Sequence, residues 1–131
     1  MRKLRLQVLE GEYAVWQLRA GAELPRAGKE GLWSVVRTGE EVSVVSRAEE
    51  VPAGAKAERG WRCIGVEGPI AFEEVGVLAA ITAPLAEAGV SVFAMSTYDT
   101  DYVLVKGEQL DAARRALKGA GHTLTREQEN R

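Results

Sequence analysis

Short runs in which apolar and polar residues alternate dominate the first half of the chain. They lie at residues 4–8, 13–18, 32–37 and 42–46 and are separated by glycine-containing or charged segments. A period of two is typical of β-strands, and the brief interruption at residues 10–12 predicts that the first two strands form a β-hairpin. The first half is therefore expected to be rich in strands and poor in helix.

The second half shows a mixed pattern. Apolar residues recur at helical spacing over residues 75–85 and 110–117, and Gly89 follows the first of these helices as a left-handed cap. Pro84 lies inside that helix and is expected to kink or divide it, because proline has no backbone N–H. Strands are predicted at residues 61–67, 90–96, 102–105 and 122–124. The resulting order is the split βαβ or ferredoxin-like arrangement, an antiparallel sheet with both helices on one face.

The two patterns predict an α+β fold made of two units. The N-terminal unit is expected to span residues 1–57 and to be strand-rich, and the C-terminal unit to span residues 58–131 with the order βαββαβ. Residues 47–60 lose the apolar period and contain Pro52, Gly54 and Gly60. This stretch indicates either a connection between the units or an ordinary surface loop, and the sequence weighs the two almost equally.

Composition and charge describe an ordinary globular protein. Hydrophobic residues make up 46% of the 131 residues, which is enough for a core. The formal net charge is -2, and basic residues are scattered among acidic ones, which argues against a general nucleic-acid binder. No apolar run is long enough to span a bilayer, and the start of the chain does not resemble a signal peptide. We expect a cytoplasmic protein that binds neither nucleic acid nor membrane.

The single cysteine and the single histidine offer little chemistry. Cys63 lies in an apolar strand-like run and is expected to be buried, and His122 has no partner pattern around it. A zinc site or a catalytic thiol is therefore not expected, and neither is a cofactor.

One stretch, residues 68–106, combines features that suit a small ligand. A helix start exposes unpaired N–H groups with partial positive charge, so it can take a carboxylate, and Gly76 followed by Val77 lets a ligand approach the backbone. Glu74 and Asp101 add negative charge that suits an ammonium or guanidinium group. Together they fit a free amino acid. The alternative is that Glu74 favours the helix dipole, that Gly76 relieves crowding and that Asp101 is only a turn former.

The same stretch carries a family resemblance. GPIAFEEVGVLAAITAPLAEAGVSVFAMSTYDTDYVLVK, with EEVSVV and AERGWRCIGVEG before it, resembles the ACT-domain family related to the ACT modules of aspartate kinases and to the CASTOR-type cytosolic arginine sensors. The resemblance covers roughly the second two-thirds of the chain. The first strands fit a degenerate ACT-like unit more loosely.

The resemblance implies a regulatory protein that binds a free amino acid without catalysis. It assigns Glu74, Gly76 and Val77 to the helix side of the site, and it assigns a turn on the other side, made of Thr97, Tyr98 and Asp101. The pair Ser43 and Val44 would line the opposite wall. The ligand is expected to be arginine or another basic amino acid, although Glu74 and Asp101 could equally receive the α-ammonium group.

The resemblance also bears on partners. The arginine sensors have four ACT-like units and this chain has length for two, so a homodimer is expected, together with a protein that it regulates. Two other function classes stay open. A structural dimerisation module would need no ligand, and an enzyme would have only Glu74 and Asp101 as a carboxylate pair, without a nucleophile or metal beside them.

Overall fold

A computed structural model describes residues 2–126, which fold into two units. The N-terminal unit spans Gly11–Trp61, and the C-terminal unit combines residues 2–10 with residues 62–126. The observed division differs from the predicted one between residues 57 and 58: the boundary falls after Trp61, and residues 2–10 join the C-terminal unit. Each unit is described by itself.

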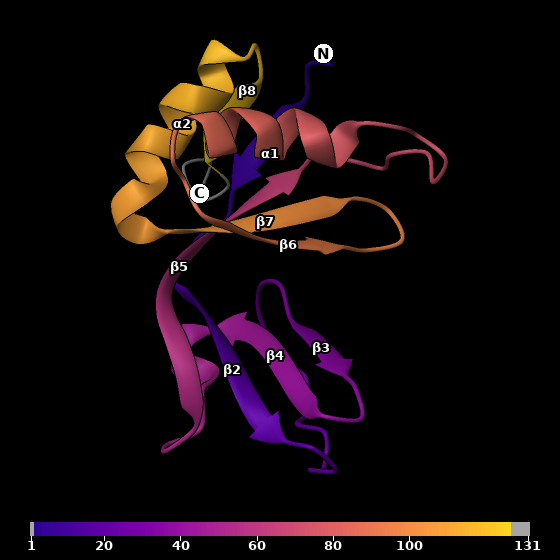
Figure 1. Cartoon of the computed structure of the whole chain (residues 1–131), viewed down its shortest axis with the longest axis vertical. Helices are drawn as coiled ribbons and strands as arrows, with labels where there is room; N and C mark the ends of the chain where they lie inside the picture. The colour runs from indigo at the N-terminus through magenta and orange to yellow at the C-terminus, as the bar shows by residue number, and fades with distance from the viewer. Residues whose placement is uncertain (1, 127–131) are drawn as a thin grey trace. The chain divides into compact units, whose positions relative to one another are not determined.

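The C-terminal unit is a five-stranded sheet with two helices (Figure 1). Its strands lie in the order β6-β7-β5-β1-β8. They are β1 (Arg5–Val8), β5 (Lys56–Val66, of which residues 62–66 belong to this unit), β6 (Val92–Ser96), β7 (Asp101–Lys106) and β8 (Thr123–Arg126). The helices are α1 (Val77–Glu87) and α2 (Leu110–Gly119), the latter preceded by a 3-10 turn, η2 (Gly107–Gln109). From β5 onward, the chain order confirms the predicted βαββαβ unit.

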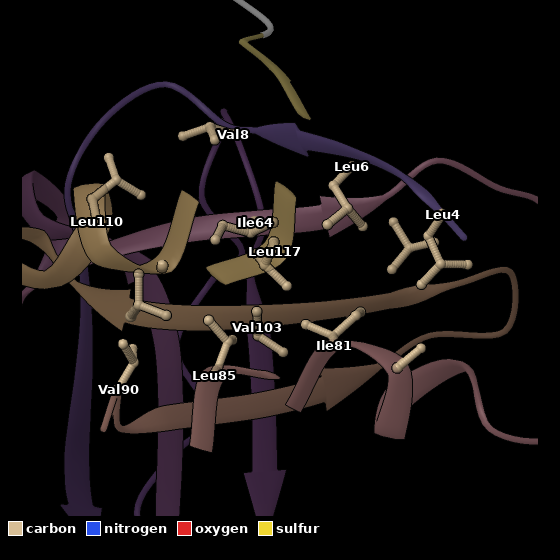
Figure 2. Close-up of a cluster of buried hydrophobic side chains, with 14 of the residues drawn as sticks. Leu4, Leu6, Val8, Ile64, Ile81, Leu85, Val90, Val103, Leu110 and Leu117 are labelled. Carbon is tan, nitrogen blue, oxygen red and sulfur yellow. The ribbon is translucent and has the colours of Figure 1, made fainter. Parts of the chain in front are cut away.

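Both helices cover the same face of this sheet, as predicted. Figure 2 shows Val8 of β1, Ile64 of β5 and Val103 of β7 pointing toward residues of the two helices, among them Leu85 and Leu117. These side chains form one buried cluster. Burying each such side chain contributes about 1.5–3 kcal/mol, so this cluster is the main source of stability in the unit.

The predicted hairpin of the first two strands is wrong. β1 lies between β5 and β8, with Leu6 opposite Val66 on the antiparallel side and opposite Leu124 on the parallel side. The sheet is therefore not wholly antiparallel. The reason is burial: Leu4, Leu6 and Val8 all enter the core beneath the helices. The alternation predicted a strand but not its partners.

Helix α1 runs from Val77 to Glu87 as a single helix, so the predicted division at Pro84 does not occur. Without an N–H, Pro84 leaves the carbonyl of Ala80 without its helical donor. The Nε2 of His122 lies 2.7 Å from that oxygen and donates to it, while Nδ1 accepts from the N–H of Leu4 at 3.0 Å. His122 is only 4% exposed, and it replaces the helical hydrogen bond that proline removes.

The N-terminal unit is built from strands, as expected. They are β2 (Tyr13–Arg19), β3 (Ser34–Arg37), β4 (Glu41–Arg47) and the first part of β5, in the order β3-β4-β2-β5, with a short 3-10 turn, η1 (Ala48–Glu50). β3 and β4, which correspond to the alternating runs at residues 32–37 and 42–46, pair with each other in antiparallel fashion. A separate small core forms on one face from residues of β2 and β4, namely Ala14, Trp16, Val42 and Val44. Neither helix in residues 2–126 is long and apolar enough to cross a membrane.

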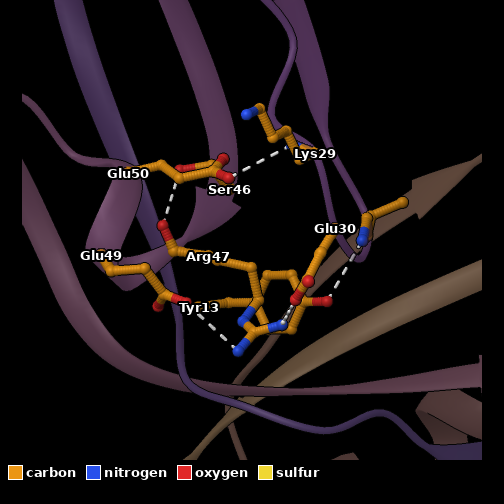
Figure 3. Close-up of polar contacts among 8 residues, drawn as sticks. Tyr13, Lys29, Glu30, Ser46, Arg47, Glu49 and Glu50 are labelled. Atoms are coloured by element: carbon orange, nitrogen blue, oxygen red, sulfur yellow. Dashed lines mark hydrogen bonds and ion pairs between the residues drawn. The ribbon is translucent and has the colours of Figure 1, made fainter.

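The long segment between β2 and β3 is held by a group of polar contacts that we call the Arg47 cluster (Figure 3). The guanidinium of Arg47 pairs with Glu30 (3.6 Å) and Glu49 (3.2 Å). The phenolic oxygen of Tyr13 accepts from the N–H of Leu32 at 3.1 Å. Lys29 donates its N–H to Glu50 at 3.4 Å. These contacts attach residues 29–32 to the sheet.

Candidate functional site

A pocket of about 400 Å³ lies in the C-terminal unit between the start of α1 and the β6–β7 turn. Two segments line it, residues within 70–79 and residues 96–101. Six of the eight predicted site residues are among them: Glu74, Gly76, Val77, Thr97, Tyr98 and Asp101. The sequence-based expectation that these two polar elements meet is confirmed, while their role in binding stays a prediction.

The helix start offers donors to this pocket. Gly76 is the N-cap of α1, and no side chain caps the helix and no acid lies in its first turn. The N–H groups of Val77, Leu78 and Ala79 have no carbonyl partner within the helix, and all three residues line the pocket. They form a patch of partial positive charge that suits a carboxylate.

Gly76 is required by its backbone conformation. Its φ of 86° lies in the left-handed region, which residues with a Cβ adopt at a cost. A Cβ at this position would meet no atom within 4 Å. The alternative that Gly76 relieves crowding is therefore excluded, and its left-handed conformation is the reason that glycine stands here.

The opposite wall is a tightly bonded turn. Thr97 donates its N–H to the carbonyl of Thr100 at 2.8 Å, and its Oγ1 accepts from the N–H of Thr100 at 3.1 Å. The hydroxyl of Thr100 donates to the carbonyl of Val66 at 2.7 Å, and Ile70 donates its N–H to the carbonyl of Asp99 at 2.8 Å. The bond to Val66 fixes the turn to the end of β5. Because the N–H and the hydroxyl of Thr97 both bond to Thr100, Thr97 shapes the wall and has few hydrogen-bonding groups left for a ligand.

The charged side chains that line the pocket are all acidic: Glu74, Asp99 and Asp101. Asp101 begins β7, and its Oδ1 accepts from the hydroxyl of Ser96 at 2.5 Å. This bond fixes the carboxylate while its second oxygen can accept from a ligand. Glu74 differs from Asp101, because its carboxylate forms an ion pair with Arg2.

Two aromatic rings stand at the pocket. Phe72 and Tyr98 have ring centroids 5.3 Å apart and are 77% and 82% exposed. The sequence reasoning found Tyr98 and missed Phe72. The sequence did contain a sign of Phe72: it is a large apolar residue that precedes the helix and does not belong to the apolar face of that helix. Such a pair can contact the aliphatic or cationic part of a ligand.

The other two predicted residues, Ser43 and Val44, lie in the N-terminal unit and are not part of this pocket. Val44 is fully buried in the core of that unit and pairs with Trp16 on one side and Val35 on the other. The assignment of Val44 to a ligand wall is therefore withdrawn. Ser43 is partly exposed and lines a separate hollow of about 320 Å³ with Gln17 and other residues of β2, β4 and β5.

Metal and thiol chemistry have no evident place among the described residues. No group of three or more His, Cys, Asp and Glu side chains within residues 2–126 could hold a metal ion. Cys63 is buried, and both ring nitrogens of His122 are engaged with the backbone. The pocket is thus a site of hydrogen-bond donors, carboxylates and exposed rings.

Comparison with known proteins places this site in a family. The sequence model described as ACT domain matches residues 56–119, which include both walls of the pocket. The Bos taurus protein named cytosolic arginine sensor for mTORC1 subunit 1 is 35% identical over 66 residues. That alignment covers 47% of this chain and 20% of the bovine protein, so the match is confined to a small part of that relative.

Solved structures extend the likeness to nearly the whole chain. The protein Atu0741 from Agobacterium tumefaciens is 33% identical with a TM-score of 0.90, and 97% of this chain and 96% of that one are covered. The ligand-free regulatory subunit of aspartate kinase from Thermus thermophilus has a TM-score of 0.55 at 12% identity, covering 85% of this chain and 93% of that one. At that identity the likeness concerns the fold alone. The match to the family model shows that residues 56–119, which hold the pocket, belong to the ACT-domain family.

Proposed function

We propose that this protein is a small regulatory protein that binds a free amino acid in the pocket of its C-terminal unit. The observation that supports this most is that one pocket has hydrogen-bond donors on one wall and a carboxylate on the facing wall. The N–H groups of Val77, Leu78 and Ala79 suit the α-carboxylate, and Asp101 on the facing turn suits the α-ammonium. A pocket of about 400 Å³ has room for a free amino acid with its side chain.

The same contacts favour binding over catalysis. A general acid or base must be able to exchange a proton with the substrate. Of the two carboxylates considered for such a role, Glu74 is paired with Arg2, and Asp101 accepts from Ser96. The lining residues include no histidine, cysteine or lysine. The pocket thus has the groups to hold a zwitterion, and the one hydroxyl bonded to a lining carboxylate, that of Ser96, has no histidine or lysine beside it among the lining residues.

The relatives support a regulatory role. One carries the name of a cytosolic arginine sensor, and the fold is shared with the regulatory subunit of aspartate kinase from Thermus thermophilus. Since this chain covers only a fifth of the bovine sensor, arginine is one candidate ligand among the amino acids. A cytoplasmic location, a homodimer and a regulated protein partner belong to the same proposal.

Thermal-shift measurements with each common amino acid, followed by calorimetry on the best, test the proposal. A ligand that binds only the folded state at a concentration of 100 times its Kd stabilises that state by about 2.7 kcal/mol. We expect at least one amino acid to raise Tm, whereas amines or carboxylic acids alone should act weakly, because each satisfies one wall. If no amino acid raises Tm while sedimentation shows a dimer, the structural dimerisation module replaces this proposal.

A further inference from the structure

Arg2 reaches the pocket from a distant part of the sequence. Its Nη1 forms an ion pair with Oε2 of Glu74, and Glu74 lines the pocket. Arg2 is not itself one of the lining residues. The carboxylate that faces the ligand space from the helix side is therefore already matched by a cation of the protein.

The residues after Arg2 fix its position. Lys3 lies along Gly121, where an added Cβ would fall 2.9 Å from Lys3 Cε. Leu4 is buried, donates its N–H to His122 and accepts from the N–H of Thr123. Because the next two residues are anchored, Arg2 loses less conformational freedom on pairing than a side chain on a free segment would.

Glu74 is also held from its own side. Its N–H donates to the carbonyl of Ala71 at 3.0 Å, which closes a turn just before α1. The helix that follows is bonded through Ala80 to His122, the residue that also anchors Leu4. Both partners of the ion pair therefore depend on the same anchor.

We infer that Arg2 is an internal counter-ion that sets the selectivity of this pocket against amino acids with basic side chains. The inference rests on the proposed function and names the ligands that the site disfavours. A ligand guanidinium or ammonium could reach the Glu74 carboxylate only by displacing Arg2 or by sharing that carboxylate with it. A neutral amino acid needs Asp101 and the helix N–H groups alone, so Arg2 does not compete with it.

The test is calorimetry with arginine, lysine and leucine on the wild-type protein and on Arg2→Gln. Removing the internal cation should strengthen arginine and lysine binding about two- to fivefold, the range expected for a partly exposed ion pair, and leave leucine unchanged. Arg2→Lys keeps the charge and should stay near the wild-type selectivity. Arg5→Gln is the matched control, because Arg5 pairs with Glu67 at 2.8 Å and neither residue lines the pocket.

Repeating the Arg2→Gln substitution in a Glu74→Gln variant tests whether Arg2 acts through Glu74. In Glu74→Gln there is no carboxylate to compete for, so adding Arg2→Gln should leave the ratio of arginine to leucine affinity unchanged. Amino-acid binding with the same ratio in wild type and in Arg2→Gln would overturn the inference and leave the proposed function intact. Absence of binding by every amino acid in both proteins would overturn both.

Discussion

The two units use their charged and polar groups in opposite ways. In the N-terminal unit, the side chain of Arg47 is only 16% exposed and forms ion pairs with Glu30 and Glu49. These ion pairs hold the loop between β2 and β3 in place. In the C-terminal unit, Asp101 and the first residues of α1 line a pocket beside the ring of Tyr98, which is 82% exposed. The comparison teaches that polar groups matched within the chain maintain the fold, whereas those left open around a pocket are the ones available to a ligand.

The largest effect is expected at Tyr13, the first residue of β2. Tyr13→Ala removes a fully buried ring and should lower the free energy of unfolding by about 3–5 kcal/mol. Tyr13→Phe keeps the ring and removes the hydroxyl, whose oxygen accepts from the N–H of Leu32, so it should cost about 0.5–1.5 kcal/mol. Urea denaturation measures both values, and equal losses would show that packing of the ring does not hold this unit.

The second prediction concerns His122. His122→Ala leaves the N–H of Leu4 and the carbonyl of Ala80 unmatched and should cost about 2–4 kcal/mol. In Pro84→Ala the new N–H can donate to Ala80, so the cost of removing His122 should fall by about 0.5–1.5 kcal/mol. A denaturant double-mutant cycle gives the difference, and strict additivity would mean that His122 does not substitute for the bond that Pro84 lacks.

The third prediction separates affinity from stability in the pocket. Asp101→Ala should weaken the best amino acid about 10- to 100-fold, since a charge-assisted hydrogen bond contributes about 1.5–3 kcal/mol. Its Tm without ligand should change little, because Asp101 lies at the pocket rather than in the core. Asp111→Ala on α2 is the matched control and should keep the affinity. If calorimetry gave the same Kd for both variants, Asp101 would not be a ligand-binding residue.

The smallest effect is expected at the helix start. Gly76→Ala places a Cβ on a left-handed residue, which should cost about 1–2 kcal/mol of stability, with a loss of affinity if the first turn of α1 shifts. Gly119→Ala lies at the end of α2 without a positive φ and with open space around it, so it should be neutral or slightly stabilising. Thermal unfolding of the two variants compares them, and equal Tm values would contradict the conformational role of Gly76.

Local pattern predicted most of the elements and failed where partners are distant in sequence. The alternation of Leu4, Leu6 and Val8 indicated a strand, but only the shared core explains why it pairs with β5 and β8. The continuity of α1 at Pro84 likewise depends on His122, which no local pattern around the helix reveals.

The failure of local pattern for partners distant in sequence also explains which site residues were predicted correctly and which were not. The six predicted residues that line the pocket come from two short segments within one unit. Helix-start chemistry and charge pointed to Glu74, Gly76, Val77 and Asp101, and the family resemblance added Thr97 and Tyr98. Val44 was assigned from a short motif, and burial in the N-terminal core excludes it. Arg2 was missed because an ion pair between residues so far apart leaves no periodic trace.

Amide chemical-shift mapping tests the central claim most directly. Uniformly labelled protein would be titrated with the amino acid that raises Tm most. The account predicts saturable shifts centred on Val77, Leu78 and Ala79 and on the turn at residues 96–101, which line the pocket. Shifts centred instead on the hollow around Ser43 in the N-terminal unit, with none at the start of α1, would contradict it.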